Sequence, residues 1–310
     1  MISNQGKGYI LAVSAAICWG ISGTFGQYLF QTKHLDADWL VTVRLLISGL
    51  LLLALAQTKK QINLLGVWKT RQDRLSLILF SIGGMLAVQY TYFATIKFSN
   101  AATATILQYL GPAMITTYIA LKNWKLPVAT EIMAIILAIT GTFLLVTHGN
   151  PKTLSISGQA LFWGISSAFA LAFYSIQPIP LLHKWDPVVV IGWAMLIAGI
   201  ACGFIHPPWR FEGDWDEITF LLVAFIILFA TLGAFYAYLV SIKYIGATKA
   251  SLLACTEPLS AALLGVSWLK TPFGLFDWIG TAMILITVIL LSIRKRSVYV
   301  PNTSVISTLK

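Results

Sequence analysis

The sequence contains few charged residues. Only 10% of its 310 residues are Asp, Glu, Lys or Arg, whereas 58% are hydrophobic. A soluble domain keeps roughly a quarter of its residues charged, so most of this protein's surface cannot face water. The shortage of charge excludes an ordinary soluble protein and indicates a membrane protein.

Cysteine and histidine are also scarce. The three cysteines, Cys18, Cys202 and Cys255, lie inside apolar segments, which excludes an extracellular disulfide framework. The four histidines are scattered without ligand spacing, so we expect no metal site. No glycine-rich phosphate loop and no serine–histidine–acid arrangement occurs, so we expect no cofactor, no ATP-driven pump and no enzyme.

Long apolar runs account for most of the chain. A run of about 20 apolar residues crosses a hydrocarbon core as a helix, and runs this long and uniformly apolar are not barrel strands. We therefore predict an all-α polytopic protein. The ten predicted spans are 8–30, 39–57, 75–96, 101–120, 127–147, 157–177, 187–206, 218–241, 247–268 and 274–293.

Lysine and arginine predict the orientation of these spans. The net charge of +10 could suggest nucleic acid, but the basic residues lie between apolar runs rather than on one face, so no nucleic-acid partner is expected. With the N-terminus inside, fifteen of the 21 basic residues fall on the inner side and five on the outer side. This bias predicts cytoplasmic N- and C-termini in the cell membrane.

The two halves of the sequence repeat. "WGIS" occurs at 19–22 and again at 163–166, and residues 96–112 align with 242–258 at an offset of 146, with six of seventeen positions identical. Five spans per half is an odd number, so the second half enters the membrane in the opposite sense. We predict two inverted five-helix repeats, 8–147 and 157–293, and a cytoplasmic tail, 294–310. Transporters often have this architecture, with the substrate site near the midplane.

These features also resemble a known family. The "WG" pairs, Arg44 early in the second span, Pro112 in the fourth span and Glu257–Pro258 in the ninth resemble the drug/metabolite transporter superfamily in its ten-span form of two EamA repeats. The resemblance covers residues 8 to 293 and implies transport of amino acids, amines or toxic compounds, as efflux, import or exchange. Many relatives have a glycine–glutamate pair about thirteen residues after each proline.

This sequence departs from that family pattern at both places. Lys125 and Thr271 stand where the family has the glycine–glutamate pair. The role of that glutamate is therefore missing here or has moved to another residue. Glu131 is a possible replacement, although its position suggests the membrane interface.

Glu257 is the acid placed deepest in a predicted span. It lies about ten residues, or ~15 Å, into the ninth span, close to the midplane. An ionised side chain there costs roughly 2.5–3.5 kcal/mol on insertion scales. Its helical neighbours Ala250, Ala254, Ser260 and Ala261 are all small. We predict substrate binding or proton coupling at Glu257, and the alternative is a carboxyl that only bonds a neighbouring helix.

Pro112 and Pro258 interrupt the fourth and ninth spans at matching places. Each proline removes one helical hydrogen bond and frees the carbonyl four residues back, of Gln108 and of Ala254. Free carbonyls at membrane depth face protein or a water-filled cavity. We predict two related hinges, and the alternative is a pair of kinks that serve packing.

Two tryptophans and an arginine are further candidates. Trp19, near Ser22, and Trp163 each lie within stripes of small residues, which fit either tight helix packing or the wall of a cavity. Arg44 lies ~8 Å from the end of its span. It either extends to the membrane surface or faces the cavity and attracts anionic groups.

Uncharged polar residues complete the predicted site, namely Gln89, Tyr92, Gln108, Tyr109 and Tyr238. They provide hydrogen bonds and aromatic surface without fixed charge, which suits small zwitterions, amines or aromatic metabolites. The sequence therefore predicts a secondary transporter of a small polar or amphipathic metabolite, most simply an exporter, acting as a monomer or homodimer in the lipid bilayer. An intramembrane enzyme acting on lipid-linked substrates and a structural subunit are the alternatives from other classes.

Overall fold

The computed structural model describes residues 4–58, 62–122, 124, 128–150, 154–210, 212–245, 250 and 253–293. Every regular element within these ranges is helical, with no β-strand among them. The expected all-α class is therefore confirmed. The expected tail 294–310 and the departure at Lys125 lie outside the described residues.

Eight of the described helical segments are long and apolar enough to cross a membrane, and Leu275–Leu291 is a shorter apolar helix. Four of the spans are single helices: α1 (Asn4–Gln31), α2 (Ala37–Gln57), α7 (Ala129–Thr147) and α10 (Pro187–Ile205). The predicted ninth span, 247–268, is described only in part and includes α14 (Thr256–Ser267). The last predicted span corresponds to α15 (Leu275–Ile293).

Polar side chains set the starts of several helices. Asp36 accepts hydrogen bonds from two backbone N–H groups at the start of α2. Asn100, Ser157 and Asp186 cap α5 (Ala101–Gln108), α8 (Gly158–Ile176) and α10 in the same way. A side-chain acceptor at this position satisfies N–H groups that have no partner within the helix. These caps explain why the helices begin where the apolar runs begin.

Two of the spans contain a π-helical segment in the middle. The first consists of α3 (Arg71–Leu79), the π-helix η2 (Phe80–Leu86) and α4 (Ala87–Phe98). The second consists of α11 (Glu217–Phe225), the π-helix η3 (Ile226–Gly233) and α12 (Ala234–Ile245). The two π-helices begin 146 residues apart, the same offset as the sequence repeat. Such bulges occur mostly as short insertions and often at functional sites.

Two other spans are broken near their prolines. The helix that begins as α5 ends at Gln108, and α6 (Gly111–Lys122) starts after a two-residue turn. A turn at Cys255 likewise precedes α14. Pro112 and Pro258 therefore lie in the first turn of a new helix, where a missing N–H group costs little. The two predicted hinge positions therefore lie next to breaks between helices.

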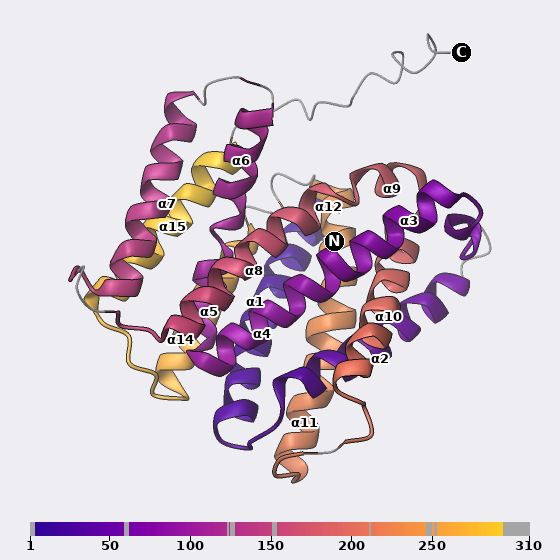
Figure 1. Cartoon of the computed structure of the whole chain (residues 1–310), viewed down its shortest axis with the longest axis horizontal. Helices are drawn as coiled ribbons and strands as arrows, with labels where there is room; N and C mark the ends of the chain where they lie inside the picture. Colours follow the sequence, from indigo (N-terminus) through magenta and orange to yellow (C-terminus); the bar gives the residue numbers. More distant parts are fainter. Residues whose placement is uncertain are drawn as a thin grey trace.

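The helices pack in pairs that match between the two halves. α2 packs against α10, and α7 packs against α15. α1 packs against α12, while α8, its counterpart in the second half, packs against α4. In Figure 1, α6, α7 and α15 form one side of the molecule, and α2 and α10 lie on the other. The short helix α9 (Ile179–Lys184) follows α8 and lies near the start of α3.

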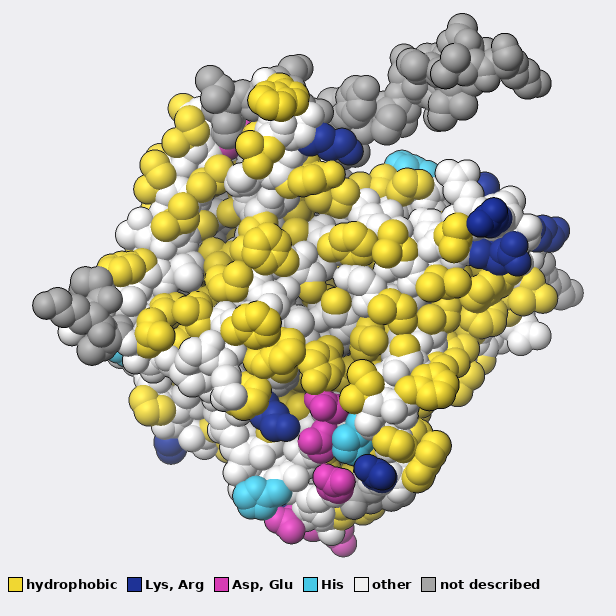
Figure 2. All heavy atoms as spheres, viewed as in Figure 1, with side chains coloured by type: hydrophobic (Ala, Val, Ile, Leu, Met, Phe, Trp, Pro, Cys, Tyr) yellow, Lys and Arg dark blue, Asp and Glu magenta, His cyan; other side chains and the backbone are white. Residues whose placement is uncertain are grey.

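Charged side chains gather at the two ends of the helix bundle. Figure 2 shows a broad hydrophobic surface, with Lys and Arg near the start of α3 and Asp and Glu near α11. We call the end with the start of α3 and the short helix α9 the α9 end, and the end with the start of α11 the α11 end. At the α11 end, Lys33 forms an ion pair with Asp216. The hydrogen bond from Lys33 holds the pKa of the Asp216 carboxyl well below its usual range.

Candidate functional site

A cavity of about 570 Å³ lies between the helices of both halves. This volume is within the range of small-molecule pockets, which is roughly 300–1,000 Å³. Ten of the sequence-predicted residues line the cavity: Trp19, Ser22, Arg44, Gln89, Tyr92, Gln108, Tyr109, Pro112, Tyr238 and Glu257. Among the described lining residues, Glu257 is the only acid and Arg44 the only basic side chain.

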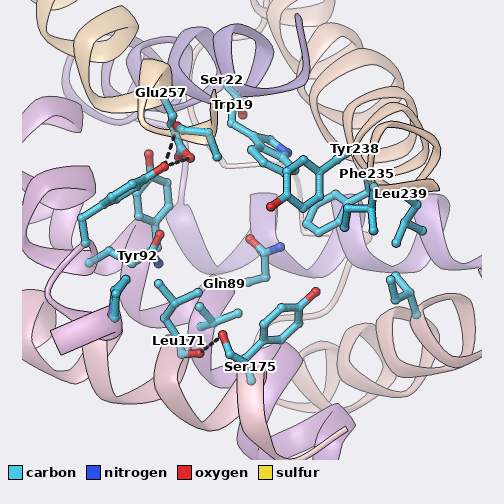
Figure 3. A pocket seen from close by; sticks show the side chains of 18 of the residues that line it. Trp19, Ser22, Gln89, Tyr92, Leu171, Ser175, Phe235, Tyr238, Leu239 and Glu257 are labelled. Atoms are coloured by element: carbon cyan, nitrogen blue, oxygen red, sulfur yellow. Dashed lines mark hydrogen bonds between the residues drawn. The ribbon is translucent and has the colours of Figure 1, made fainter. Parts of the chain in front are cut away.

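Glu257 occupies the first turn of α14, directly after the helix break. The Tyr109 hydroxyl lies 2.7 Å from the Ala254 carbonyl oxygen and 3.3 Å from Oε2 of Glu257 (Figure 3). The single hydroxyl hydrogen fits the shorter contact best, so Tyr109 satisfies the carbonyl that Pro258 leaves free. Its oxygen can then accept a hydrogen bond from a protonated Glu257. No basic side chain of the described residues forms an ion pair with Glu257.

Close packing between α1 and α14 holds Glu257 in place. A Cβ atom added at Gly20 would lie 2.6 Å from the carbonyl oxygen of Glu257 and 3.0 Å from the backbone nitrogen of Ala261. The Thr24 hydroxyl, one turn further along α1, lies 3.2 Å from the Gly20 carbonyl oxygen and 3.4 Å from the Ala261 carbonyl oxygen, so it also touches the backbone of α14. Small residues allow such approach between membrane helices. The backbone of α1 thus fixes the first turn of α14, and with it the acid.

Arg44 is buried rather than extended to the membrane surface. Its exposed fraction is 4%, and its guanidinium carbon lies 4.7 Å from the centre of the Phe93 ring. Its Nε atom has no hydrogen-bond partner within the described part of the chain. The surface-anchor interpretation of Arg44 was therefore wrong, because the side chain lines the cavity.

An aromatic wall faces Glu257 across the cavity. The Trp19 ring lies 5.3 Å from the Phe235 ring and 5.2 Å from the Tyr238 ring (Figure 3). Such tilted and edge-on contacts stabilise aromatic pairs beyond the effect of burial. The Trp19 Nε1–H group is buried without an acceptor among the described residues. The wall that these rings form is therefore an apolar aromatic surface.

Some of the predicted uncharged polar residues form hydrogen bonds between helices, and others face the cavity. Tyr92 shares a 2.9 Å hydrogen bond with Thr105, and the Gln108 amide donates to Ser167 at 2.8 Å, so both help to join helices. Gln89 has its amide directed into the cavity in Figure 3. Ser22 is 4% exposed and lies beside Glu257 and Trp19 in that view.

Trp163 is the one predicted cavity residue that the structure places elsewhere. It packs edge-on against Tyr90 of α4 and against Phe162. The side of α8 that faces α5 is occupied by Gly164, which contacts Leu107, and by the buried Ser167. Trp163 therefore lies on the flank of α8, and the repeat does not give it the same role as Trp19.

Neither Glu131 nor Thr271 brings a replacement for the family's glutamate to the described lining of the cavity. The Glu131 carboxylate accepts a hydrogen bond from the Val128 backbone N–H at 3.1 Å and so caps α7. The Thr271 hydroxyl oxygen accepts from the Gln27 amide at 3.1 Å. Neither residue lines the cavity.

The sequence analysis did not identify two aromatic lining residues, Phe235 and Tyr174. Phe235 is 146 positions after Gln89, so the repeat itself pointed to it. Tyr174 lies in α8 beside Phe80 of η2, with 5.2 Å between the rings. No sequence signal distinguished Tyr174 from other aromatic residues of the apolar runs.

One end of the cavity is closed by hydrogen bonds and aromatic contacts. At the α11 end, the Gln27 side chain accepts from the Ala101 backbone N–H at 3.0 Å and donates to Thr271. The Trp268 ring stacks on Tyr28 close by. In the other direction the lining extends to Leu182 of α9, which is 37% exposed. The cavity thus leads from the middle of the bundle toward the α9 end.

This fold and cavity define a class of protein, the multi-pass helical membrane proteins that hold a small polar site among their spans. Comparison with known proteins then gives the family. The sequence matches the EamA-like transporter family over residues 6–147 and 158–293, and the chain belongs to that family. It is a membrane transporter, and the expected membership of the drug/metabolite transporter superfamily is confirmed.

Individual relatives carry the same description. The chain is 42% identical to the uncharacterized inner membrane transporter YicL of Salmonella typhimurium, over 94% of this chain and 96% of that protein. It is 23% identical to the uncharacterized transporter YwfM of Bacillus subtilis, over 93% and 94%. One solved crystal structure, at 16% identity, covers 92% of this chain and 96% of its own with a TM-score of 0.63, and supports the fold alone.

Proposed function

We propose that this transporter exports a small polar or amphipathic metabolite by secondary active transport, alternating the access of one central site. We further propose ten spans in two inverted five-helix repeats, with both termini cytoplasmic. The matching helix pairs support the repeats, as do the two π-helices at the repeat offset. The charge bias of the loops supports the orientation.

The observation that carries the proposal is an acid, Glu257, alone among the described lining residues of a cavity between the two halves. A carboxyl away from water favours its neutral form until a cation approaches. Tyr109 is placed to accept a hydrogen bond from the neutral form. We assign Glu257 the alternate binding of a proton and a cationic group of the substrate, so that arrival of one releases the other.

The closed and open ends of the cavity support alternating access. The Gln27 contacts and the Trp268–Tyr28 stack close the α11 end, which the proposed topology places outside. The lining reaches the α9 end, which that topology places inside. The helix breaks at Pro112 and Pro258 lie beside the cavity and are suited to act as hinges. The protein works in the bilayer as a monomer or homodimer, with no nucleic-acid partner.

Two measurements test this function. The first is a thermal-unfolding screen of small amines, amino acids and aromatic metabolites with detergent-purified protein, where ~100 Kd of ligand stabilises the fold by about 2.7 kcal/mol. The second is flux of each stabilising solute in proteoliposomes, with protein-free liposomes as the control. Gradient-driven flux supports secondary transport. Chemical conversion of the solute without flux would instead support the intramembrane enzyme.

Flux from vesicles of known orientation tests the direction of transport separately. Export predicts that a proton gradient directed inward drives solute outward from inside-loaded vesicles of known orientation. Import driven by the same gradient would move proton and solute together, and would contradict the proton-for-cation exchange assigned to Glu257. Exchange that needs solute on both sides and no proton gradient would contradict that role too, while leaving the cavity as the binding site.

A further inference from the structure

Arg44 is a buried cation with no hydrogen-bonding or ionic partner among the residues that the structure describes. Its side chain is 4% exposed, and within the described residues it forms neither an ion pair nor a hydrogen bond. Buried charges in proteins are normally paired, because removal from water is costly without compensation. An unpaired guanidinium that lines a cavity therefore points to a partner outside the chain.

Part of the Arg44 guanidinium faces the cavity, where a ligand can reach it. Its guanidinium carbon lies 4.7 Å from the centre of the Phe93 ring, a cation–π contact that helps to hold the group in position. The Nε atom, on the edge of the group, is buried and has no acceptor. Because Arg44 lines the cavity while its Nε is buried, the terminal nitrogens are the atoms it presents there, and end-on binding through both gives two hydrogen bonds to a carboxylate. Lysine has no such fork.

The net charge of the cavity favours a singly charged anion over a doubly charged one. Arg44 is the only basic side chain among the described lining residues, and Glu257 adds no positive charge in either of its forms. A monoanion balances one guanidinium, whereas a phosphate dianion would leave a buried negative charge uncompensated.

We propose that Arg44 is the carboxylate-binding subsite of this cavity, so that the transported molecule is an amphipathic monocarboxylate. Its apolar part lies on the wall of Trp19, Phe235 and Tyr238. This inference rests on the proposed transport function for calling the ligand a substrate. With a cationic group at Glu257, the two subsites together describe a zwitterion bound between α2 and α14.

The test uses benzoate and its neutral isostere benzamide as probes, at constant ionic strength and neutral pH, with the purified full chain in detergent. We expect benzoate to raise the unfolding temperature of the wild type more than benzamide does. Arg44→Gln should weaken benzoate binding by about tenfold or more, and Arg44→Lys should be intermediate. Arg74→Gln, which removes an exposed arginine away from the cavity, should bind benzoate like the wild type.

A second readout distinguishes a subsite from a structural arginine. Without any carboxylate, Arg44→Gln should unfold at the same temperature as the wild type or higher, because a buried unpaired charge is removed. A clear loss of unfolding temperature in that variant, or equal benzoate affinity in all four proteins, would overturn the inference. Failure of Arg44→Gln to fold, with Arg44→Lys indistinguishable from the wild type, would overturn it too. Because the test measures binding alone, absence of flux in proteoliposomes would refute the transport proposal and leave this subsite standing.

Discussion

Gly20→Ala tests the close packing that positions the acid of the cavity. The added methyl would lie 2.6 Å from the Glu257 carbonyl oxygen, 0.8 Å short of an ordinary 3.4 Å contact. The obstacle is backbone, so α1 and α14 must move apart. Overpacking of this kind costs about 1–3 kcal/mol, and the better helix propensity of alanine returns up to about 1 kcal/mol. We expect a net loss of up to about 2 kcal/mol of unfolding free energy.

The assay is thermal unfolding of detergent-purified protein, followed by tryptophan fluorescence and by loss of monodisperse protein. Gly158→Ala is the matched control, because a Cβ atom there meets nothing within 4 Å. Gly20→Ala should lower the unfolding temperature and also weaken ligand binding, since the first turn of α14 shifts. Equal unfolding temperatures for the two variants would refute the packing of α1 on α14 described here.

Three further predictions concern the cavity wall, the topology and the α11 end. Trp19→Ala should change substrate affinity or range with near-normal expression, whereas Trp163→Ala should leave both unchanged; equal effects in binding assays would contradict the separation of the two. Impermeant thiol labelling should mark Leu65→Cys from the inside only and Glu212→Cys from the outside only, and labelling of both from one side would refute the inverted repeats. Asp216 has a lowered pKa in the folded protein, so its ion pair stabilises at neutral pH and is lost only below about pH 4. The difference in unfolding temperature between Asp216→Asn and the wild type should therefore stay constant from about pH 5 to about pH 8, and a change within that range would contradict the assignment.

The sequence predicted the helical class and most of the cavity because both depend on simple physical rules. Long apolar runs allow no spanning structure other than helices. An acid placed ~15 Å into such a run is costly unless it faces protein or water, so Glu257 stood out by depth alone. The repeat offset of 146 also relates Tyr92 to Tyr238 and Pro112 to Pro258. Three of these four line the cavity, and Pro258 directly follows Glu257.

Other features depend on details that hydropathy does not record. A π-helix adds one residue to a turn without changing composition, so η2 and η3 look like ordinary apolar helix in the sequence. The position of Arg44 along its span predicts its distance from the membrane surface. The direction of its side chain depends on which face of α2 packs against α4 and α10, and the hydropathy pattern does not show this. Trp163 shows the limit of repeat symmetry, because matching residues can occupy different flanks when neighbouring side chains differ.

The helix breaks near Pro112 and Pro258 also depend on contacts that the sequence pattern does not show. A proline predicts one lost hydrogen bond and a kink or a break, but it does not predict which residue satisfies the freed carbonyl. In this protein the Tyr109 hydroxyl, from the other half of the chain, provides that partner for Ala254. Only the three-dimensional structure brings these two residues together.

The central claim is that Glu257 exchanges a proton for a substrate cation, and flux driven by a pH gradient in proteoliposomes tests it most directly. The comparison is between the wild type and Glu257→Gln, which keeps the shape and the hydrogen bond to Tyr109 but cannot ionise. Our account predicts that the variant folds normally, loses pH-driven flux, and loses the pH dependence of substrate binding from about pH 5 to about pH 8. Full pH-driven flux in Glu257→Gln would show that Glu257 is only a structural hydrogen-bonding residue and that the coupling group lies elsewhere.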